Sequence, residues 1–308
     1  MRVFVTGASG WIGSAVVAEL LGAGHQVVGL ARSAESADAL RAAGAEVRLG
    51  DLDDLENLKS AASDSDGVIH LAFKHELAFS GNFQAAADAD RLAVEAFGEA
   101  LADSDRPFVL ASGILGIAPG HLVTEADGHV RDAHFAALGG GPVARWETAE
   151  FTLSLASRGV RSSIVRLPPT NHADGDNGFV ANLVNIAREK GVSGYIGDGA
   201  NRWPAVHRLD SAKLFRLAVE GAPAGTTLHA IADEGVPIRE MAEVIGRHLS
   251  IPEVSISAED AGEHFTWMAH FLALDSPASG KVTQELLKWE PTQKGLIADL
   301  DEGHYFNR

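Results

Sequence analysis

The sequence predicts an α/β protein built on a doubly wound, mostly parallel sheet, with a smaller α+β lobe at the C-terminal end. Three observations lead to this fold class. Apolar, β-branched runs alternate with helical segments, a glycine-rich corner joins the first run to the first helix, and the alternation stops near Thr170. We therefore expect a sheet domain over residues 1–170 and a smaller lobe over 171–308, with some strands and helices of that part returning to the sheet.

The expected elements follow the chain in order. Strands are predicted within residues 3–5, 25–33, 47–49, 66–73, 106–113 and 161–170, because these runs are short, apolar and rich in Val, Ile and Leu. Helices are predicted within 15–21, 34–44, 83–102, 143–158, 180–190 and 238–248, and a short one within 276–292. Right-handed crossovers between parallel strands should place helices on both faces of the sheet.

Composition restricts the classes of partner. The 308 residues are 46% hydrophobic and 22% charged, which is ordinary for a globular protein with a large core. A formal net charge of −17 repels phosphate backbones and anionic lipids, so we expect neither nucleic acid nor a membrane as partner. The absence of cysteine and of a basic, apolar leader is compatible with a cytoplasmic location.

The first corner has the sequence TGASGWIG, which places Gly7, Gly10 and Gly13 between a strand and a helix. Gly7 would take a tight turn, Gly10 would let backbone N–H groups approach a pyrophosphate, and Gly13 would let the helix pack on the strand. The helix N-terminus adds partial positive charge. A tight turn that binds nothing is the alternative, but the strand, the helix and the N-terminal position together favour a dinucleotide site.

The ends of the second and third strands indicate which dinucleotide binds. An NAD site usually presents an acidic residue at the end of the second strand, whereas this strand ends in GLARS. Arg32 can pair with a 2′-phosphate and Ser33 can add a hydroxyl, so we expect NADP(H) to be favoured over NAD(H). The alternative for Arg32 is a solvated surface arginine. Asp51 and Leu52 are expected at the adenine, although Asp51 and Asp53 can instead cap the next helix.

The stretches TGASGWIG, GDLDD, VIHLAF, VLASG and SSIVRLPPT follow one another in an order typical of the short-chain dehydrogenase/reductase superfamily. The chain resembles its extended and atypical branches, akin to the NAD-dependent epimerase/dehydratase group, over nearly its whole length. The resemblance implies a Rossmann-type fold, a small-molecule substrate bound by the C-terminal lobe, and a homodimer formed by helices 83–102 and 143–158. It also implies cofactor contacts from Ser9, Trp11, Ile12, Leu71, Ala72, Phe73, Ala111, Pro168 and Pro169.

The chain departs from this family at the usual proton donor, a Tyr-x-x-x-Lys pair on one helix. If Glu150 is aligned with the glutamate that commonly follows the pair, Pro142 and Trp146 occupy the two positions. The chain has only two tyrosines, Tyr195 and Tyr305, and neither is followed by a lysine four residues later. The cofactor half of the motif set is therefore intact while the usual acid is missing.

Four residues are candidates to stabilise or protonate the alkoxide that hydride transfer creates: Ser112, His172, His75 and Arg145. Their ordinary interpretations are a hydroxyl at a strand end, two solvated loop histidines and a surface arginine. No metal site is expected, since HADGD has the composition of a polar loop. An aromatic segment is expected to form either a wall of the substrate pocket or the core of the lobe; it comprises Phe265, Trp267, Met268, Phe271 and Leu272.

Two functions fit these features. The first is an NADP(H)-dependent oxidoreductase, of the ketoreductase type, that reduces a carbonyl or related small molecule without the Tyr/Lys pair. The second is a non-enzymatic NADP(H)-binding sensor or regulatory protein. We favour the enzyme, because the cofactor itself carries the hydride and the protein mainly supplies orientation and electrostatics.

Overall fold

A seven-stranded parallel sheet forms the centre of the molecule, with strand order β10-β6-β5-β4-β1-β2-β3. The computed structural model describes residues 1–128 and 140–307. Every adjacent pair of strands in this sheet is parallel, so all their carboxyl ends meet at one edge. The strands are β1 (Arg2–Thr6), β2 (Gln26–Ala31), β3 (Glu46–Leu49), β4 (Gly67–His70), β5 (Pro107–Gly113), β6 (Arg161–Leu167) and β10 (Thr226–His229).

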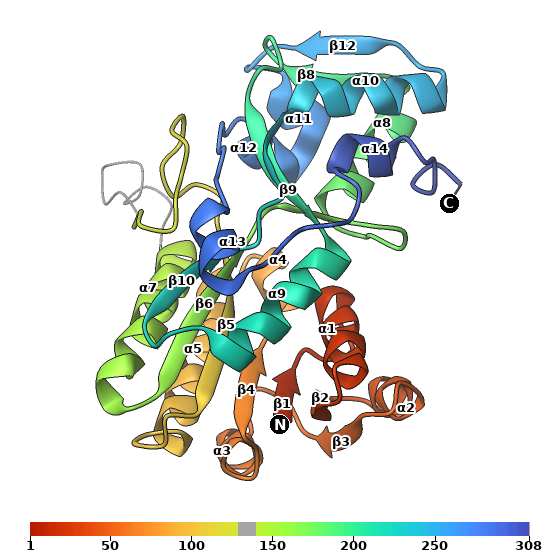
Figure 1. Ribbon diagram of the computed structural model, residues 1–308. Helices are drawn as coiled ribbons and strands as arrows, with labels where there is room; N and C mark the ends of the chain where they lie inside the picture. The colour runs from red at the N-terminus through yellow and green to blue at the C-terminus, as the bar shows by residue number, and fades with distance from the viewer. Residues whose placement is uncertain (129–139, 308) are drawn as a thin grey trace.

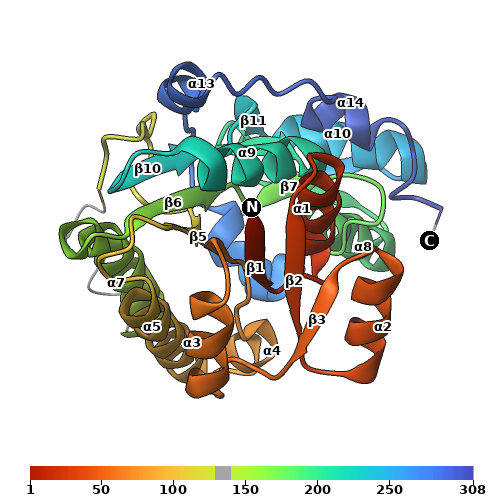
Figure 2. The same ribbon diagram turned by 60° about the horizontal axis from the view of Figure 1, so that its bottom comes forward.

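Helices cover both faces of the sheet, as Figure 2 shows. One face packs against α1 (Trp11–Gly22), α2 (Ala34–Ala42) and α9 (Arg208–Gly221), and the other against α3 (Leu55–Ser63), α5 (Phe83–Ala100) and α7 (Gly140–Ser154). A 3-10 turn, Leu155–Arg158, extends α7. The predicted doubly wound α/β fold is therefore confirmed. A short helix that the sequence analysis did not predict, α4 (His75–Phe79), follows β4.

The chain leaves the main sheet after β6 and builds most of a C-terminal lobe, seen above the sheet in Figure 1. Two small sheets lie in it, β11-β9-β7 and β12-β8. Their strands are β7 (Thr170–His172), β8 (Ser193–Ile196), β9 (Arg202–His207), β11 (Asp233–Pro237) and β12 (Glu253–Ile256). The helices of this part are α8 (Phe179–Lys190), α10 (Ile238–Leu249), α11 (Ala261–Phe265), η2 (Thr266–Met268), α12 (Ala269–Leu272), α13 (Lys281–Leu287) and α14 (Leu296–Leu300).

Two elements from the C-terminal part of the chain, α9 and β10, belong to the main sheet and the helices that cover it. β10 pairs with β6 at the sheet edge, and α9 packs beside α1. Among the described helices, none combines the length and the apolar character needed to cross a bilayer.

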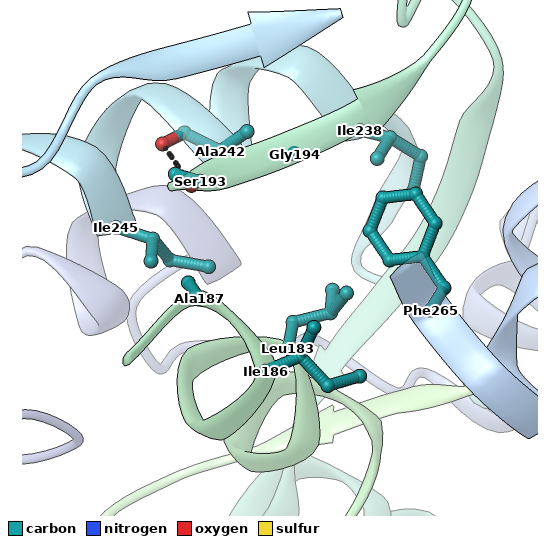
Figure 3. A pocket seen from close by; sticks show the side chains of 9 residues that line it. All are labelled: Leu183, Ile186, Ala187, Ser193, Gly194, Ile238, Ala242, Ile245 and Phe265. Atoms are coloured by element: carbon teal, nitrogen blue, oxygen red, sulfur yellow. Dashed lines mark hydrogen bonds between the residues drawn. The ribbon is translucent and has the colours of Figure 1, made fainter. Parts of the chain in front are cut away.

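A small apolar pocket lies inside the lobe between α8, β8 and α10 (Figure 3). Its one side-chain hydroxyl, that of Ser193, already donates to the Ala242 carbonyl at 2.8 Å. The pocket therefore offers no free side-chain polar group to a ligand, and we interpret it as a packing gap. Its lining residues are Leu183, Ile186, Ala187, Ser193, Gly194, Ile238, Ala242, Ile245 and Phe265.

A buried polar network connects the end of β6 to the segment before α13. Arg166 Nη1 donates to the Asp127 carbonyl at 2.7 Å and lies 3.3 Å from His229 Nε2. His229 Nδ1 lies 2.8 Å from the Ser279 carbonyl oxygen, which only accepts, so Nδ1 carries the ring proton. Burial lowers the pKa of His229 to about 4. The neutral imidazole thus accepts from Arg166 and fixes the loop that follows β5.

Candidate active site

The glycine-rich corner forms a turn that tolerates no side chain at two of its positions. Gly7 has φ +65°, a conformation that favours glycine. A Cβ at Gly13 would lie 2.0 Å from the Gly7 carbonyl oxygen, whereas one at Gly10 would lie 3.1 Å from the same atom. Gly13 is therefore needed for the packing of α1 against the turn, and Gly10 keeps the entrance to α1 open.

The start of α1 fits the diphosphate of a dinucleotide. Gly10 is the N-cap and provides no side-chain cap, and no acidic residue lies in the first turn. The first backbone N–H groups of a helix have no partner inside the helix, so these donors point outward together with the positive end of the helix dipole. Ser9 and Gly10 are exposed at this point, and Ile12 is partly exposed. The corner thus supplies N–H donors and room, as a bound pyrophosphate requires.

Trp11 joins the same corner to the C-terminal lobe. Its indole N–H donates to the Asn171 carbonyl at 3.1 Å, and the Arg208 guanidinium lies 4.2 Å from the ring centroid. A Cβ at Gly175 would lie 3.2 Å from the ring. The side chain of Trp11 is therefore occupied by packing, and this residue faces the cofactor site with its backbone.

At the end of β2, the two residues expected at the 2′-phosphate differ in their availability. Arg32 is 71% exposed in its side chain and pairs with Glu76 at 2.9 Å. An exposed pair of this kind contributes little to stability, so the guanidinium is free to exchange partners. Ser33 instead caps α2, where its hydroxyl accepts from the Ser36 N–H at 3.2 Å.

Three acidic residues follow β3, and the one that caps the next helix is not one of the two that the sequence suggested. Asp54, not Asp51 or Asp53, caps α3 by accepting from the Asn57 N–H. Asp51 accepts from the Asp53 N–H at 2.8 Å, which stabilises the turn, and the Asp53 carboxylate pairs with Lys74 at 2.6 Å. The capping interpretation of Asp51 and Asp53 is therefore wrong. Leu52 lies buried beneath this turn.

A series of polar contacts links the ends of β1 and β4 to α5. The Ala72 N–H donates to Thr6 Oγ1 at 3.3 Å, and Thr6 Oγ1 lies 2.5 Å from His70 Nδ1. Because Thr6 Oγ1 accepts from Ala72, its own proton is available to His70 Nδ1, which leaves the ring proton on Nε2. His70 Nε2 lies 3.2 Å from Asp90 Oδ1, and both residues are buried. Asp90 was not identified from the sequence.

Arg145 is the cation that the fold brings to this region. Its guanidinium lies 3.9 Å from the centroid of the Phe73 ring, and its Nε is buried with no hydrogen-bond partner among the described residues. Burial lowers the pKa of Arg145, while the negative charge of Asp90 opposes that change. Desolvation and the Arg145 charge together lower the pKa of His75, whose ring lies 5.1 Å from that of Phe73. The surface-arginine interpretation is therefore wrong.

Ser112 and the segments that flank it lie at the same carboxyl edge of the sheet. β5 pairs with β4 through Leu110 and with β6 through Ser112, which is opposite Arg166. Ser112 is buried and Ala111 is partly exposed. Leu71 follows β4 directly, and Pro168 and Pro169 follow β6. The strand ends thus bring Ser112 and the Arg145–Phe73 contact to neighbouring positions.

The interpretation of His172 as a solvated loop histidine is wrong. It is the last residue of β7 and has no exposed surface. Its Nδ1 lies 2.8 Å from Asp299 Oδ2 on α14, and its ring meets the His207 ring edge-on at 5.4 Å. Burial opposes ionisation of Asp299, but the hydrogen bond from His172 prevails and lowers the pKa of Asp299. This geometry indicates that His172 anchors α14 to the lobe.

The HADGD stretch is likewise less exposed than a polar loop would be. Asp176 is buried and accepts from the Tyr305 hydroxyl at 2.9 Å and from the Gly178 N–H at 2.7 Å. Burial and the Asp176 charge raise the pKa of Tyr305. Tyr305 is therefore an un-ionised anchor of the C-terminal segment. Tyr195, the other tyrosine, lies on β8, so neither tyrosine belongs to α7.

Similarity to known proteins identifies the family. The model of the NAD dependent epimerase/dehydratase family matches residues 3–107. An uncharacterized protein of Schizosaccharomyces pombe is 47% identical over 99% of this chain and 100% of its own length. The decarboxylating sterol-4-alpha-carboxylate 3-dehydrogenase of Dictyostelium discoideum is 26% identical over 78% of this chain and 74% of its own.

Solved structures share the architecture. A dTDP-glucose 4,6-dehydratase double mutant from Streptomyces venezuelae, with NAD bound, superposes with a TM-score of 0.76 at 19% identity, covering 99% of this chain and 96% of that one. At this identity the similarity establishes the fold alone. The chain thus carries an NAD dependent epimerase/dehydratase family domain in residues 3–107, and over its full length it belongs with the uncharacterized protein of Schizosaccharomyces pombe.

Proposed function

We propose that the protein is an NADP(H)-dependent reductase of small carbonyl compounds in which Arg145 replaces the usual Tyr/Lys pair. The observation that carries this proposal is the half-buried side chain of Arg145, whose guanidinium lies over Phe73 and whose buried Nε has no partner among the described residues, on the helix that carries the Tyr/Lys pair in related enzymes. A buried cation with an unpartnered N–H costs free energy unless it is used or compensated. Its position suits a group that stabilises negative charge on a substrate oxygen.

The residues divide the chemistry as follows. Bound NADPH would supply a hydride to the carbonyl carbon, and the electron pair of the C=O bond would then become an alkoxide. Arg145 would lower the energy of that alkoxide electrostatically, as preorganised donors do at oxyanions. Ser112 would donate a hydrogen bond to the same oxygen from the end of β5. The proton that completes the alcohol would come from water or from His75, whose lowered pKa makes its protonated form a stronger acid.

Asp90 would hold this arrangement in place. It is 3% exposed, it lies 3.2 Å from His70 Nε2, and its negative charge acts on Arg145. A buried cation keeps its charge when a carboxylate compensates it. Through His70 and Thr6, Asp90 is also connected to the turn that begins the glycine-rich corner. The site would therefore align the cation with the cofactor motif.

Turnover of NADPH tests the proposed function directly. We expect oxidation of NADPH with at least some members of a panel of aldehydes and ketones, and a lower kcat in Ser112→Ala with unchanged NADPH affinity. His172→Ala should lower the melting temperature while kcat per folded molecule stays close to wild type, because His172 packs against α14. Tight NADPH binding without turnover across a broad panel would instead identify a non-enzymatic sensor.

The Arg32→Ala variant tests the choice of cofactor. We expect NADPH to bind more tightly than NADH, and Arg32→Ala to weaken NADPH binding by about 1.5–3 kcal/mol, the range of charge-assisted hydrogen bonds, with little change for NADH. Titration of both nucleotides by fluorescence measures this. Arg41→Ala is the matched control, because Arg41 is an exposed arginine on α2 that pairs with Asp38. A tenfold preference of the wild type for NADH would refute the assignment.

A further inference from the structure

Four aromatic side chains of the C-terminal lobe form one cluster, which we call the lobe aromatic cluster: Phe179, Trp203, Trp267 and Phe271. The Phe179 ring contacts the other three, with centroids 5.5 Å from Trp203, 5.6 Å from Trp267 and 5.4 Å from Phe271. Trp267 and Phe271 also meet edge-on at 5.9 Å. Such edge-to-face contacts stabilise rings beyond the area that they bury. The cluster is therefore a preorganised aromatic surface.

One member of the cluster is presented to the outside at a conformational cost. Trp203 is fully buried, whereas Trp267 is 46% exposed. Thr266, immediately before it, has φ +54° and ψ −127°, which is unusual for a β-branched residue. Strain of this kind costs on the order of 1–3 kcal/mol and is concentrated at functional sites. Trp267 is thus an exposed side chain in a segment whose other residues Phe265 and Met268 are buried.

The chain that follows β5 is tied to the part of the lobe that carries the cluster. In Figure 1, α11 and α12 lie in the lobe above the main sheet. Leu115, two residues after β5 ends, packs against the same hydrophobic core as Phe179 and Phe271. The Gly120 N–H donates to the Asp275 carbonyl at 2.7 Å, which ties the chain after β5 to the chain after α12. The chain that begins just after Ser112 and Gly113 thus reaches the part of the lobe that carries the aromatic surface.

Arg202, the cation adjacent to Trp203, is already neutralised, and two other cations of the lobe have partners. Arg202, adjacent to Trp203, makes two hydrogen bonds to Asp275 at 3.0 and 2.9 Å. Lys190 Nζ lies 3.3 Å from the Glu263 carbonyl oxygen, and Arg239 pairs with Glu243 at 3.2 Å. A nucleoside diphosphate would need such cations, and the net charge of −17 adds repulsion. Among the described residues the surface is therefore suited to an uncharged ligand.

We propose that the substrate is an uncharged carbonyl compound with an aromatic ring or an extended conjugated group, which stacks on Trp267 and Phe271, and not a nucleotide sugar. This inference rests on the proposed reductase function and assigns its substrate class. The aromatic part of the substrate occupies the lobe aromatic cluster, and its carbonyl group points toward Ser112 and Arg145. The dTDP-glucose 4,6-dehydratase with the same fold acts on a nucleotide sugar, so the two proteins differ in substrate class.

Binding and turnover test this inference separately. Calorimetry on the NADPH-loaded protein should show binding of benzamide, an unreactive aromatic probe, and weaker or no binding of UDP-glucose. Trp267→Ala should lower benzamide affinity about tenfold, while Trp267→Phe should retain most of it. Leu286→Ala is the control, because Leu286 is 44% exposed on α13, outside the cluster. UDP-glucose binding more tightly than benzamide, or equal losses in Trp267→Ala and Leu286→Ala, would overturn the proposal.

Kinetics separate this inference from the proposed function itself. The ratio of kcat/KM for cinnamaldehyde over that for propanal should fall about tenfold in Trp267→Ala and stay unchanged in Leu286→Ala. Turnover that does not discriminate between these aldehydes contradicts the substrate class and leaves the reductase in place. Trp267-dependent benzamide binding with no turnover of any carbonyl contradicts the reductase and leaves the aromatic site in place.

Discussion

Replacing Arg145 with methionine should lower kcat/KM for carbonyl reduction by about 10²–10³, with NADPH affinity close to wild type. Methionine fills a similar volume over the Phe73 ring but carries no charge, so the alkoxide loses its electrostatic partner. The glycine-rich corner that would hold the diphosphate lies on different elements, β1 and α1, and is left intact. Steady-state kinetics and NADPH titration on the same preparation measure the two quantities.

The charge balance of the site supplies the control for this variant. Removing Arg145 takes away a positive charge that acts on the buried carboxylate of Asp90, so the variant should also lose stability. The double variant Arg145→Met/Asp90→Asn should therefore recover most of the unfolding free energy while kcat/KM remains low. If the double variant recovered activity together with stability, Arg145 would have a structural role only.

Gly13→Ala should have the largest effect on cofactor binding of any single methyl group added to the chain. The new Cβ would lie 2.0 Å from the Gly7 carbonyl oxygen and 2.8 Å from the Gly7 carbonyl carbon, both backbone atoms of the turn. Overpacking typically costs 1–3 kcal/mol, and backbone cannot move aside as a flexible side chain can. We expect the losses in the free energy of unfolding and in the free energy of NADPH binding to add up to about 3 kcal/mol. Urea denaturation measures the first and nucleotide titration the second.

Gly22→Ala is the matched control on the same helix. Gly22 ends α1, and a Cβ there would meet nothing within 4 Å. Alanine favours helix more than glycine does, so stability should stay the same or rise slightly while NADPH affinity is unchanged. Comparable losses of NADPH affinity in both variants would show that α1 as a whole, and not the contact at Gly7, controls the corner.

The sequence was most informative at positions where the local backbone geometry allows only one type of residue. Gly7 needs a positive φ and Gly13 needs the absence of a Cβ, and both demands follow from a strand that turns directly into a helix. The parallel sheet was predictable for a similar reason, because short apolar runs between helical segments leave few other topologies.

The sequence was least informative where a partner lies far along the chain. His172 is buried only because Asp299, 127 residues later, accepts from its ring. Arg145 is half-buried because the segment after β4 places Phe73 against it, while α5 carries Asp90, whose charge acts on it. No periodicity in a single sequence encodes such pairings.

One missed residue did leave a local signal. Asp90 lies on the buried face of α5 among Ala86, Ala87, Ala93 and Val94, at helical spacing. A carboxylate on an apolar helix face requires a buried partner, so the pattern predicts a polar contact there. Attention to the helix face, beyond the loops and strand ends, would have found this part of the candidate site.

Trp11 connects the corner proposed for the cofactor to the lobe proposed for the substrate. Its rigid ring is held by the Asn171 carbonyl and the Arg208 guanidinium, while its backbone belongs to the corner that faces the diphosphate. Any ligand that shifts the C-terminal lobe against the main sheet must therefore also shift that corner. The change that substrate causes in cofactor affinity must then equal the change that cofactor causes in substrate affinity, since linked binding is reciprocal. A single indole thus links the C-terminal lobe to the glycine-rich corner, so we expect the proposed substrate and cofactor sites to be coupled.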